Sequence, residues 1–380
     1  MATFERMRGA VKSDGVGLGW GSQLRQHVSR EKEERQAILR VFKEIEEDKR
    51  VVDTITNLNF FGEWVKWEAA MQLDRRWHSL LAYQTDNQLK FRLLATEDQF
   101  PTPSRLSMWG VGDGWCPLCL RIGVTQRASL KHVLCSCPYA LGEDKLARQS
   151  GEKGHIGRIT WRHDSVLFAI FRGVLRVVNR FKKEQQEGKL DVSKQVNSTS
   201  IQFRSEGNVK YAAVKVPVVQ QLLAKAVDWK LMFDMNVPEY EQRKERPFPP
   251  EIVPSPEGRP DAVIWSCSTK TVIWIELTSP WEENMTVRHS EKHARYTQLK
   301  IDCEDNGWKV HPLCIEVGCR GYVSQSFQWM CKVLGFTKGE AKDLKFELEK
   351  TALHCSHAIV AARYVPEWPP RPLMDVSLWH

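Results

Sequence analysis

Two carboxylates in the segment RPDAVIWSCSTKTVIWIE are the first candidates for chemistry. Asp261 follows Pro260 at the start of the run AVIW, and Glu276 closes the run TVIWI with fourteen residues between the two acids. This length fits an antiparallel hairpin that turns at CSTK, in which the first residue of one strand and the last residue of its partner lie close together. Two such acids predict a Mg²⁺ site for phosphodiester hydrolysis. The alternative is that Asp261 caps a strand and Glu276 pairs with a surface arginine.

Hydrolysis of a phosphodiester also requires a cation that stabilises the transition state. The helix predicted after the hairpin carries Arg288, Lys292 and Tyr296 at intervals of four residues, which places them on one stripe. Lys292 is our candidate catalytic cation. Arg288, Tyr296 and the nearby Arg295 are candidate nucleic-acid contacts. Glu282, just past the second strand, is a candidate third oxygen ligand or a residue that orients Lys292.

A cysteine cluster provides a second kind of metal site. Cys116 and Cys119 form a C-x2-C pair, and His132 and Cys137 complete the pattern C-x2-C-x12-H-x4-C. Three thiolates and one imidazole suit a tetrahedral, structural Zn²⁺ ion without an open position for water. Cys135 competes with Cys137 for the fourth position. The alternative is a set of free thiols with a coincidental histidine.

Two other polar groups are candidates for phosphate binding or packing. Arg320 lies between two glycines that predict a turn, which would aim its guanidinium at a phosphate. Glu316, inside an apolar run, needs a partner, which could be Arg320 or the metal region, and a structural ion pair is the favoured role. Arg162 is a further candidate phosphate contact. His163 and Asp164 follow it, but adjacent side chains on a helix point about 100° apart, which favours capping and packing over a shared catalytic role.

Composition limits the class of protein. The 380-residue chain is long enough for two or three domains, and 42% hydrophobic with 27% charged residues is typical of a soluble globular protein. No apolar stretch is long enough to cross a bilayer, and the charged start MATFERMRGAVKSDG lacks the apolar segment of a secretory signal. We therefore expect an intracellular protein, nuclear or cytoplasmic, with no membrane partner.

Cysteine content and net charge indicate which metals and partners the protein could bind. Ten cysteines without a secretory signal favour free thiols or metal ligands over disulfides. The formal net charge of +8 favours an acidic partner such as nucleic acid, although many proteins with such a charge bind none. Both observations agree with a zinc-containing nucleic-acid-binding protein.

The elements that must position these residues follow an α/β order in the second half of the chain. Seven prolines between Pro238 and Pro260 predict an extended connection before this half. Apolar, β-branched runs predict strands at 262–265, 271–277 and 309–317. Helical patterns occur at 22–50, twice within 60–98, and at 161–188, 285–304 and 324–356.

Six segments in order resemble the C-terminal part of the open reading frame of site-specific non-LTR retrotransposons that carry a restriction-enzyme-like endonuclease. The segments are LLATEDQFPTPSRLSMWG, CPLC with LKHVLCSCPYAL, RITWRHDSVLFAI, RPDAVIWSCSTKTVIWIELTSPWEEN, EKHARYTQL and GWKVHPLCIEVGCRGYVSQSF. The resemblance implies a CCHC zinc knuckle and an α/β endonuclease domain of the PD-(D/E)xK type, a central mixed sheet flanked by helices. Asp261, Glu276 and Lys292 carry over as catalytic residues. One departure is Thr278 at the position where PD-(D/E)xK nucleases have lysine.

The resemblance also implies a domain order. We expect a helical region at 1–105, the knuckle and its following helix at 106–190, a connector at 191–258, and the endonuclease core at 259–380 or from near 210. The first 50 residues have no motif. The sequence contains no Asp-Asp pair, so the metal-binding motif of a polymerase is missing and no reverse transcription is expected.

The leading hypothesis is a Mg²⁺-dependent DNA endonuclease joined to a structural zinc knuckle that binds DNA or element RNA, without a small-molecule cofactor. A second hypothesis is a remnant or co-opted fragment that binds zinc and nucleic acid but no longer cleaves. A third is a cellular repair nuclease of the same fold, which the zinc knuckle and the ordered segments argue against.

Overall fold

The structure is a computed structural model, and it divides the chain into two units, Met1–Lys66 and Trp67–His380. The residues that it describes are 31–57, 69–71, 73–74, 76, 81–82, 84–141, 157–189, 221–235, 248–254, 256–365 and 373–374. The start of the helix predicted at 22–50, much of the region 60–83 and the first part of the proline-rich segment, 238–247, lie outside the described residues. The expected division into four regions remains a prediction.

The first unit contributes one described helix, α3 (Glu31–Asn57). Its sequence consists of strong helix formers with alternating charges and contains neither glycine nor proline, which explains why a long helix forms. The helix overlaps the one predicted at 22–50 and continues seven residues further.

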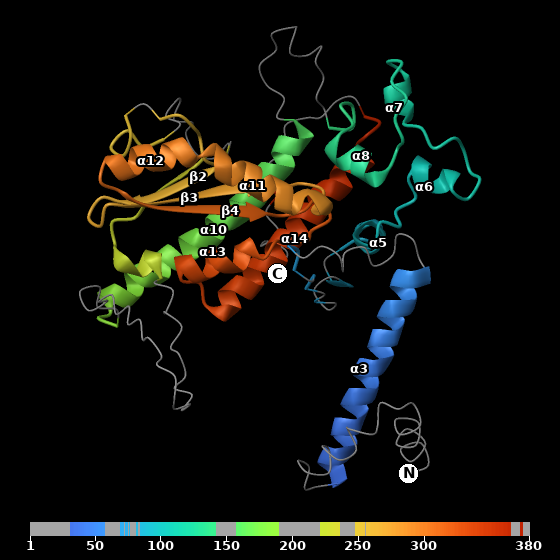
Figure 1. Ribbon diagram of the computed structural model, residues 1–380, viewed down its shortest axis with the longest axis horizontal. Coiled ribbons are helices and arrows are strands. Elements are labelled where there is room, and N and C mark those ends of the chain that lie inside the picture. The colour runs from blue at the N-terminus through green and yellow to red at the C-terminus, as the bar shows by residue number, and fades with distance from the viewer. Residues whose placement is uncertain are drawn as a thin grey trace, which may run out of the picture. The chain divides into compact units, whose positions relative to one another are not determined.

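A four-stranded mixed sheet forms the centre of the second unit (Figure 1). The first three strands pair in antiparallel fashion, and the fourth pairs with the third in parallel, so the chain crosses over between them. Ala262 pairs with Ile275 in the hairpin, which turns at residues 267–270 as predicted. In sheet order the strands are β1 (Lys230–Phe233), β2 (Ala262–Ser266), β3 (Thr271–Thr278) and β4 (Lys309–Glu316).

Helices cover both faces of this sheet (Figure 1). On one face the core contains Ile264, Ile273 and Ile275, packed against α10 (Arg158–Gln186), α13 (Ser326–Leu334) and α14 (Lys338–Ala361). On the other face lie α11 (Met285–Arg295) and α12 (Thr297–Asp305), which form the crossover between β3 and β4.

Strand alternation decides which side chains reach which face. Val263 and Trp274 belong to the core on the α12 side, with Tyr296 and Leu299. Because side chains on a strand alternate, Glu276 follows Trp274 onto this same face. The hairpin register places Asp261 opposite Glu276, just before β2 begins. The acids are therefore brought together by the pairing of β2 with β3.

The cysteine-bearing part of the second unit consists of short helices. Its residues share a core with Trp281, Cys319, Leu353 and Val360 from the C-terminal part of the chain. The elements are α5 (Asp86–Thr96), α6 (Pro103–Ser107), α7 (Pro117–Leu120) and α8 (Leu130–Cys135), and two 3₁₀ helices elsewhere are η3 (Leu222–Lys225) and η4 (Glu282–Asn284).

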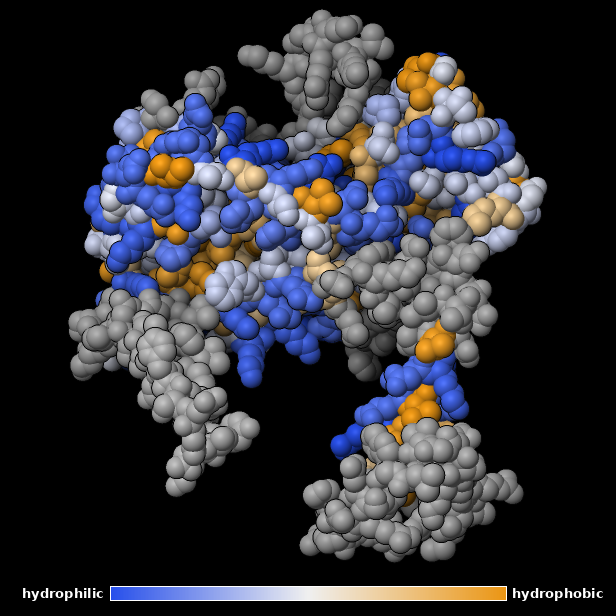
Figure 2. Space-filling model, viewed as in Figure 1, coloured by the Kyte–Doolittle hydropathy of each residue, from blue (hydrophilic) through white to orange (hydrophobic). Residues whose placement is uncertain are grey.

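The mixed α/β class and the three predicted strands are confirmed. Strand β1 is an addition, because it lies in the segment that we expect to be a connector. No helix among the described residues is both long and apolar enough to cross a membrane. Figure 2 shows that hydrophilic residues predominate on the face that carries α11 and α12, with a few exposed apolar side chains between them.

Candidate active site and metal centre

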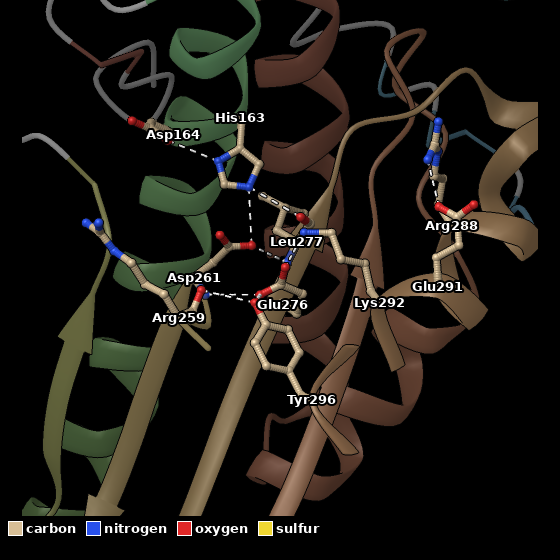
Figure 3. A network of polar contacts seen from close by, with 10 residues as sticks. All are labelled: His163, Asp164, Arg259, Asp261, Glu276, Leu277, Arg288, Glu291, Lys292 and Tyr296. Atoms are coloured by element: carbon tan, nitrogen blue, oxygen red, sulfur yellow. Dashed lines mark hydrogen bonds and ion pairs between the residues drawn. The ribbon is translucent and has the colours of Figure 1, made fainter. Parts of the chain in front are cut away.

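Glu276 is at the centre of a polar network at one end of the sheet (Figure 3). Its side chain is 1% exposed, and Lys292 from α11 forms an ion pair with Oε1. The hydroxyl of Tyr296 lies 2.9 Å from Oε2, and the backbone N–H of Asp261 donates to the same oxygen at 3.2 Å. The predicted proximity of the two acids and of Lys292 is therefore present.

Asp261 is held by a different set of donors. The backbone N–H of Leu277 donates to Oδ2 at 2.7 Å, and Nε2 of His163 lies 3.3 Å from the same oxygen. Oδ1 makes no hydrogen bond or ion pair with any residue that the structure describes. Asp261 therefore offers one carboxylate oxygen to a ligand, whereas Glu276 uses both of its oxygens within the protein.

His163 joins this network from α10, on the opposite face of the sheet from Lys292. Its Nδ1 lies 3.0 Å from Oδ1 of Asp164, and its Nε2 also lies 3.3 Å from the carbonyl oxygen of Leu277. The expected capping and packing roles of His163 and Asp164 do not include this contact of the histidine with Asp261. Adjacent side chains do diverge, but the imidazole has nitrogens on two sides and reaches Asp164 with one and Asp261 with the other.

The electrostatics of the network follow from burial and mutual contact. Burial and the charge of Asp261 raise the pKa of Glu276, while Lys292 and Tyr296 act in the opposite direction. Burial alone would lower the pKa of His163, but its hydrogen bonds to Asp164 and Asp261 raise it to about 10. Burial and the neighbouring Glu276 raise the pKa of Tyr296 above its ordinary value, so its hydroxyl stays protonated and donates.

Only part of the predicted stripe on α11 reaches the acids. Lys292 and Tyr296 do so, whereas Arg288 forms a surface ion pair with Glu291, 2.6 Å between Nη1 and Oε2, and lies apart from the carboxylates in Figure 3. Arg295 is exposed at the end of the helix. Tyr296 is only 5% exposed, so its ring is unavailable for stacking on a base, and its hydroxyl serves Glu276 instead.

Glu282 and Arg320 are not placed where the sequence predicts them to act. They form a buried ion pair, 2.7 Å between Nε and Oε2, with side chains 0% and 2% exposed. The backbone N–H of Arg320 donates to the other oxygen of Glu282 at 2.6 Å, and the guanidinium lies over the ring of Trp281. Glu282 is therefore a partner of Arg320 and not a ligand beside Lys292, and Arg320 is too buried to contact a phosphate.

Arg162 is likewise a buried structural residue. It is 1% exposed, and its guanidinium donates to the carbonyl oxygens of Leu134 at 3.2 Å and Ser279 at 3.4 Å and to the hydroxyl of Ser356 at 3.3 Å. These internal acceptors explain how the guanidinium can be buried. Arg162 is therefore not exposed for contact with a phosphate, contrary to the prediction.

Glu316 has a partner that the sequence did not indicate. Its Oε1 lies 2.9 Å from Nδ1 of His289, and Ser326 donates to Oε2 at 2.9 Å. Arg320 pairs with Glu282, so the Glu316–Arg320 contact that we considered is replaced by a Glu316–His289 pair.

The four predicted zinc ligands form a buried group. The ligand atoms of Cys116, Cys119, His132 and Cys137 all lie within 4.8 Å of one another. Nε2 of His132 lies 3.3 Å from Sγ of Cys119, while its Nδ1 lies 3.3 Å from the hydroxyl of Ser136, so Nε2 is the nitrogen turned toward the thiols. This group could hold a metal ion.

The local sequence explains how these four side chains meet. Pro117 begins α7 directly after Cys116, and Ser129 caps α8 by accepting the backbone N–H of His132 at 3.1 Å. Burial and hydrogen bonding to Cys116 raise the pKa of the Cys119 thiol to about 12, so binding of a cation here would release protons.

Cys135 points elsewhere. Its Sγ lies 3.7 Å from that of Cys319, in the turn after β4, and it is not part of the four-ligand group. Between the two candidates for the fourth position, the geometry favours Cys137 over Cys135.

Together the fold and the sites define a mixed α/β protein with a buried Cys₃His group and a separate carboxylate network at one end of its sheet. Within the described ranges, the Cys₃His group alone brings three or more potential metal ligands together, and the acid pair does not reach that number. No family model and no curated protein matches this chain.

Proposed function

We propose that the chain is a divalent-metal-dependent DNA endonuclease of retrotransposon origin, with a zinc module that binds nucleic acid. The observation that carries the proposal is the convergence of Asp261, Glu276 and Lys292 at one end of the sheet. Two carboxylates beside one ammonium group, all three largely buried, form a constellation suited to hydrolysis of a phosphodiester.

The donor set fits a hard cation. Asp261 has a carboxylate oxygen without a described protein partner, and Oε1 of Glu276, which pairs with Lys292, retains acceptor capacity, whereas Oε2 already accepts from Tyr296 and from the backbone of Asp261. Asp261 and Glu276 would hold Mg²⁺, which supplies a Lewis acid and activates water at neutral pH.

The protein supplies the rest of the chemistry. Lys292 has a side chain that is 20% exposed, so its ammonium group is accessible to a phosphate while it pairs with Glu276. There it would stabilise the negative charge that develops in the transition state. Tyr296 keeps Glu276 oriented through its hydroxyl, and the buried walls of Trp274 and Tyr296 limit access of water to that carboxylate.

Thr278 at the usual lysine position does not remove the catalytic cation. Thr278 lies on the same strand as Glu276, and Lys292 enters from the crossover helix and reaches the same carboxylate. The mixed sheet with helices on both faces is also the architecture that the resemblance implies. These features support a PD-(D/E)xK-type domain with a displaced lysine.

The Cys₃His group supports the zinc part of the proposal. Three thiols and one imidazole nitrogen are the ligands that structural Zn²⁺ sites use, and four protein ligands leave no position for a reacting water. Its role would be to stabilise the short helices α7 and α8. The net charge of +8 is favourable for an interaction with nucleic acid.

The test is nicking of supercoiled plasmid by the purified protein with Mg²⁺. Asp261→Ala should abolish Mg²⁺-dependent nicking, whereas Asp305→Ala, an exposed aspartate at the end of α12, should nick at the rate of the parent. Equal activity of Asp261→Ala and the parent would remove the assignment.

A second candidate is a nucleic-acid-binding protein that does not cleave. It is favoured by the neutralisation of both acids within the protein, Asp261 by His163 and Glu276 by Lys292. Such a protein would bind zinc and show salt-dependent affinity for DNA. In the nicking assay, however, the plasmid substrate would stay supercoiled with and without Mg²⁺.

A further inference from the structure

His163 makes an interaction that the proposed chemistry does not yet use. It comes from α10, about 100 residues before the acids in sequence, and it is the one imidazole among the described residues that contacts Asp261. Its side chain is 21% exposed and that of Asp261 is 16% exposed, so the contact lies at the rim of the network and not in bulk solvent.

Two donors converge on a single oxygen of Asp261. Leu277 donates its backbone N–H to Oδ2 at 2.7 Å, and Nε2 of His163 lies 3.3 Å from the same atom. A carboxylate whose one oxygen is held by two donors cannot rotate freely about its last bond. Oδ1, the oxygen without a described protein partner, is thereby held in one direction.

Asp164 fixes the imidazole in turn. It lies 3.0 Å from Nδ1 of His163 and is 6% exposed, so this contact is shielded from solvent. Asp164 is the acceptor at Nδ1 and Asp261 is the acceptor at Nε2. Both nitrogens can donate to these acceptors in only one orientation of the ring. The chain Asp164, His163, Asp261 has the form in which a carboxylate orients a histidine and the histidine orients the functional group.

We propose that His163, oriented by Asp164, is a positioning residue that holds Oδ2 of Asp261 and so presents Oδ1 to the divalent cation. The inference rests on the proposed function and deepens it, because it names the residue that sets the geometry of the first acid. Leu277 contributes the second donor through its backbone N–H, and this donor would remain if the side chain were substituted.

Substitution of His163 by glutamine or by asparagine tests its two contacts separately, because each amide replaces a different ring nitrogen. The amide nitrogen of glutamine takes the place of Nε2 and can still donate to Asp261, whereas that of asparagine takes the place of Nδ1 and reaches only toward Asp164. His354→Ala is the matched control, since His354 is a half-buried histidine with a side-chain contact to Gln88 on α5, 3.1 Å away.

The experiment is calorimetric titration of the full chain with Mg²⁺ in the absence of DNA, with thermal unfolding recorded for each variant. His163→Ala and His163→Asn should weaken Mg²⁺ binding by about 10- to 100-fold, the usual effect of removing a residue that orients a ligand. His163→Gln should restore most of the affinity, Asp164→Asn should lose part of it, and His354→Ala should bind like the parent.

The outcomes separate this inference from the function on which it rests. Parental affinity in His163→Asn, or equal weakness in His163→Gln and His163→Asn, overturns the positioning role. Parental affinity in Asp261→Ala, or no Mg²⁺ binding by the parent, overturns the metal site itself and the inference with it. Should His163→Ala fail to fold, the comparison of the glutamine and asparagine variants decides, since both retain a polar side chain of similar size.

Discussion

Lys292 forms an ion pair with Glu276, which lies sixteen residues earlier on the central strand β3. The carboxylate is buried at 1% exposure, and the lysine reaches it from the crossover helix α11 on the same face of the sheet. A buried carboxylate without this partner would tend to take up a proton, because burial raises its pKa. The pair therefore opposes the effect of burial on the pKa of Glu276 and favours its ionised form.

Substitution of Lys292 should reduce cleavage more than it reduces binding. We expect Lys292→Ala to lower the nicking rate by about 10²–10³-fold, the effect of removing one group that stabilises transition-state charge. Lys300→Ala, which removes a lysine from a surface pair with Glu304 on α12, should leave nicking unchanged. Single-turnover nicking with saturating protein measures the rate, and equal rates for the two variants would contradict the role of Lys292.

Tyr296→Phe should change the pH dependence of nicking. Its hydroxyl helps lower the pKa of Glu276, so its removal raises that pKa further. Glu276 must be ionised to hold a cation, so activity is present above its pKa and is lost as the pH falls through it. The acidic limb of the rate profile should move to higher pH, with a larger loss near about pH 6 than near about pH 8.5.

The phenylalanine variant also separates two roles of Tyr296. It retains the ring and removes only the hydroxyl, so a role of the ring in packing alone would leave the pH profile of the variant identical to that of the parent. A shift with unchanged DNA affinity identifies the hydroxyl as the functional part. An unchanged profile would contradict the contact with Glu276.

Cysteine substitutions should distinguish the metal ligands from their neighbour. Cys137→Ser should lose bound zinc and lower the free energy of unfolding, because a closed zinc site contributes directly to folding. Cys135→Ser should retain one zinc ion per chain, since its thiol faces Cys319. Native mass spectrometry gives the zinc content of both variants. Loss of zinc from Cys135→Ser alone would reverse the assignment.

Glu282→Gln should destabilise the protein without removing a metal ligand. It removes the negative charge of Glu282 from the buried pair with the guanidinium of Arg320, and breaking a buried pair in this way costs about 3–5 kcal/mol. Glu291→Gln is the matched control, because it breaks an exposed pair with Arg288, where about 0–1 kcal/mol is expected. Urea denaturation measures both. Loss of Mg²⁺ binding in folded Glu282→Gln would return Glu282 to the site.

The sequence predicts those contacts of the site that are made between elements adjacent in the chain. Asp261, Glu276 and Lys292 lie within one hairpin and its following helix, so strand alternation and helical spacing are enough to bring them together. The C-x2-C pair with its following histidine and cysteine is similarly local. These patterns depend on residues that are close in sequence, and the structure places those residues near one another as expected.

Contacts between distant segments could not be predicted in the same way. His163 reaches Asp261 only because α10 packs against the sheet, and nothing in the sequence near either residue indicates this. The pair Glu282–Arg320 spans 38 residues, and both look like surface charges when each is considered alone. Their burial depends on how η4 and the turn after β4 meet, which a pattern of residue types does not contain.

Arg162 connects the Cys₃His group to the carboxylate network. Its buried guanidinium contacts Leu134, which lies between the candidate metal ligands His132 and Cys137, and Ser279, which lies three residues after Glu276. If the Cys₃His module binds nucleic acid and the carboxylate network cleaves it, this buried connection would hold the two at a fixed separation. In an endonuclease of this design the fold itself acts as a ruler, so the number of nucleotides between the bound sequence and the nick would be constant.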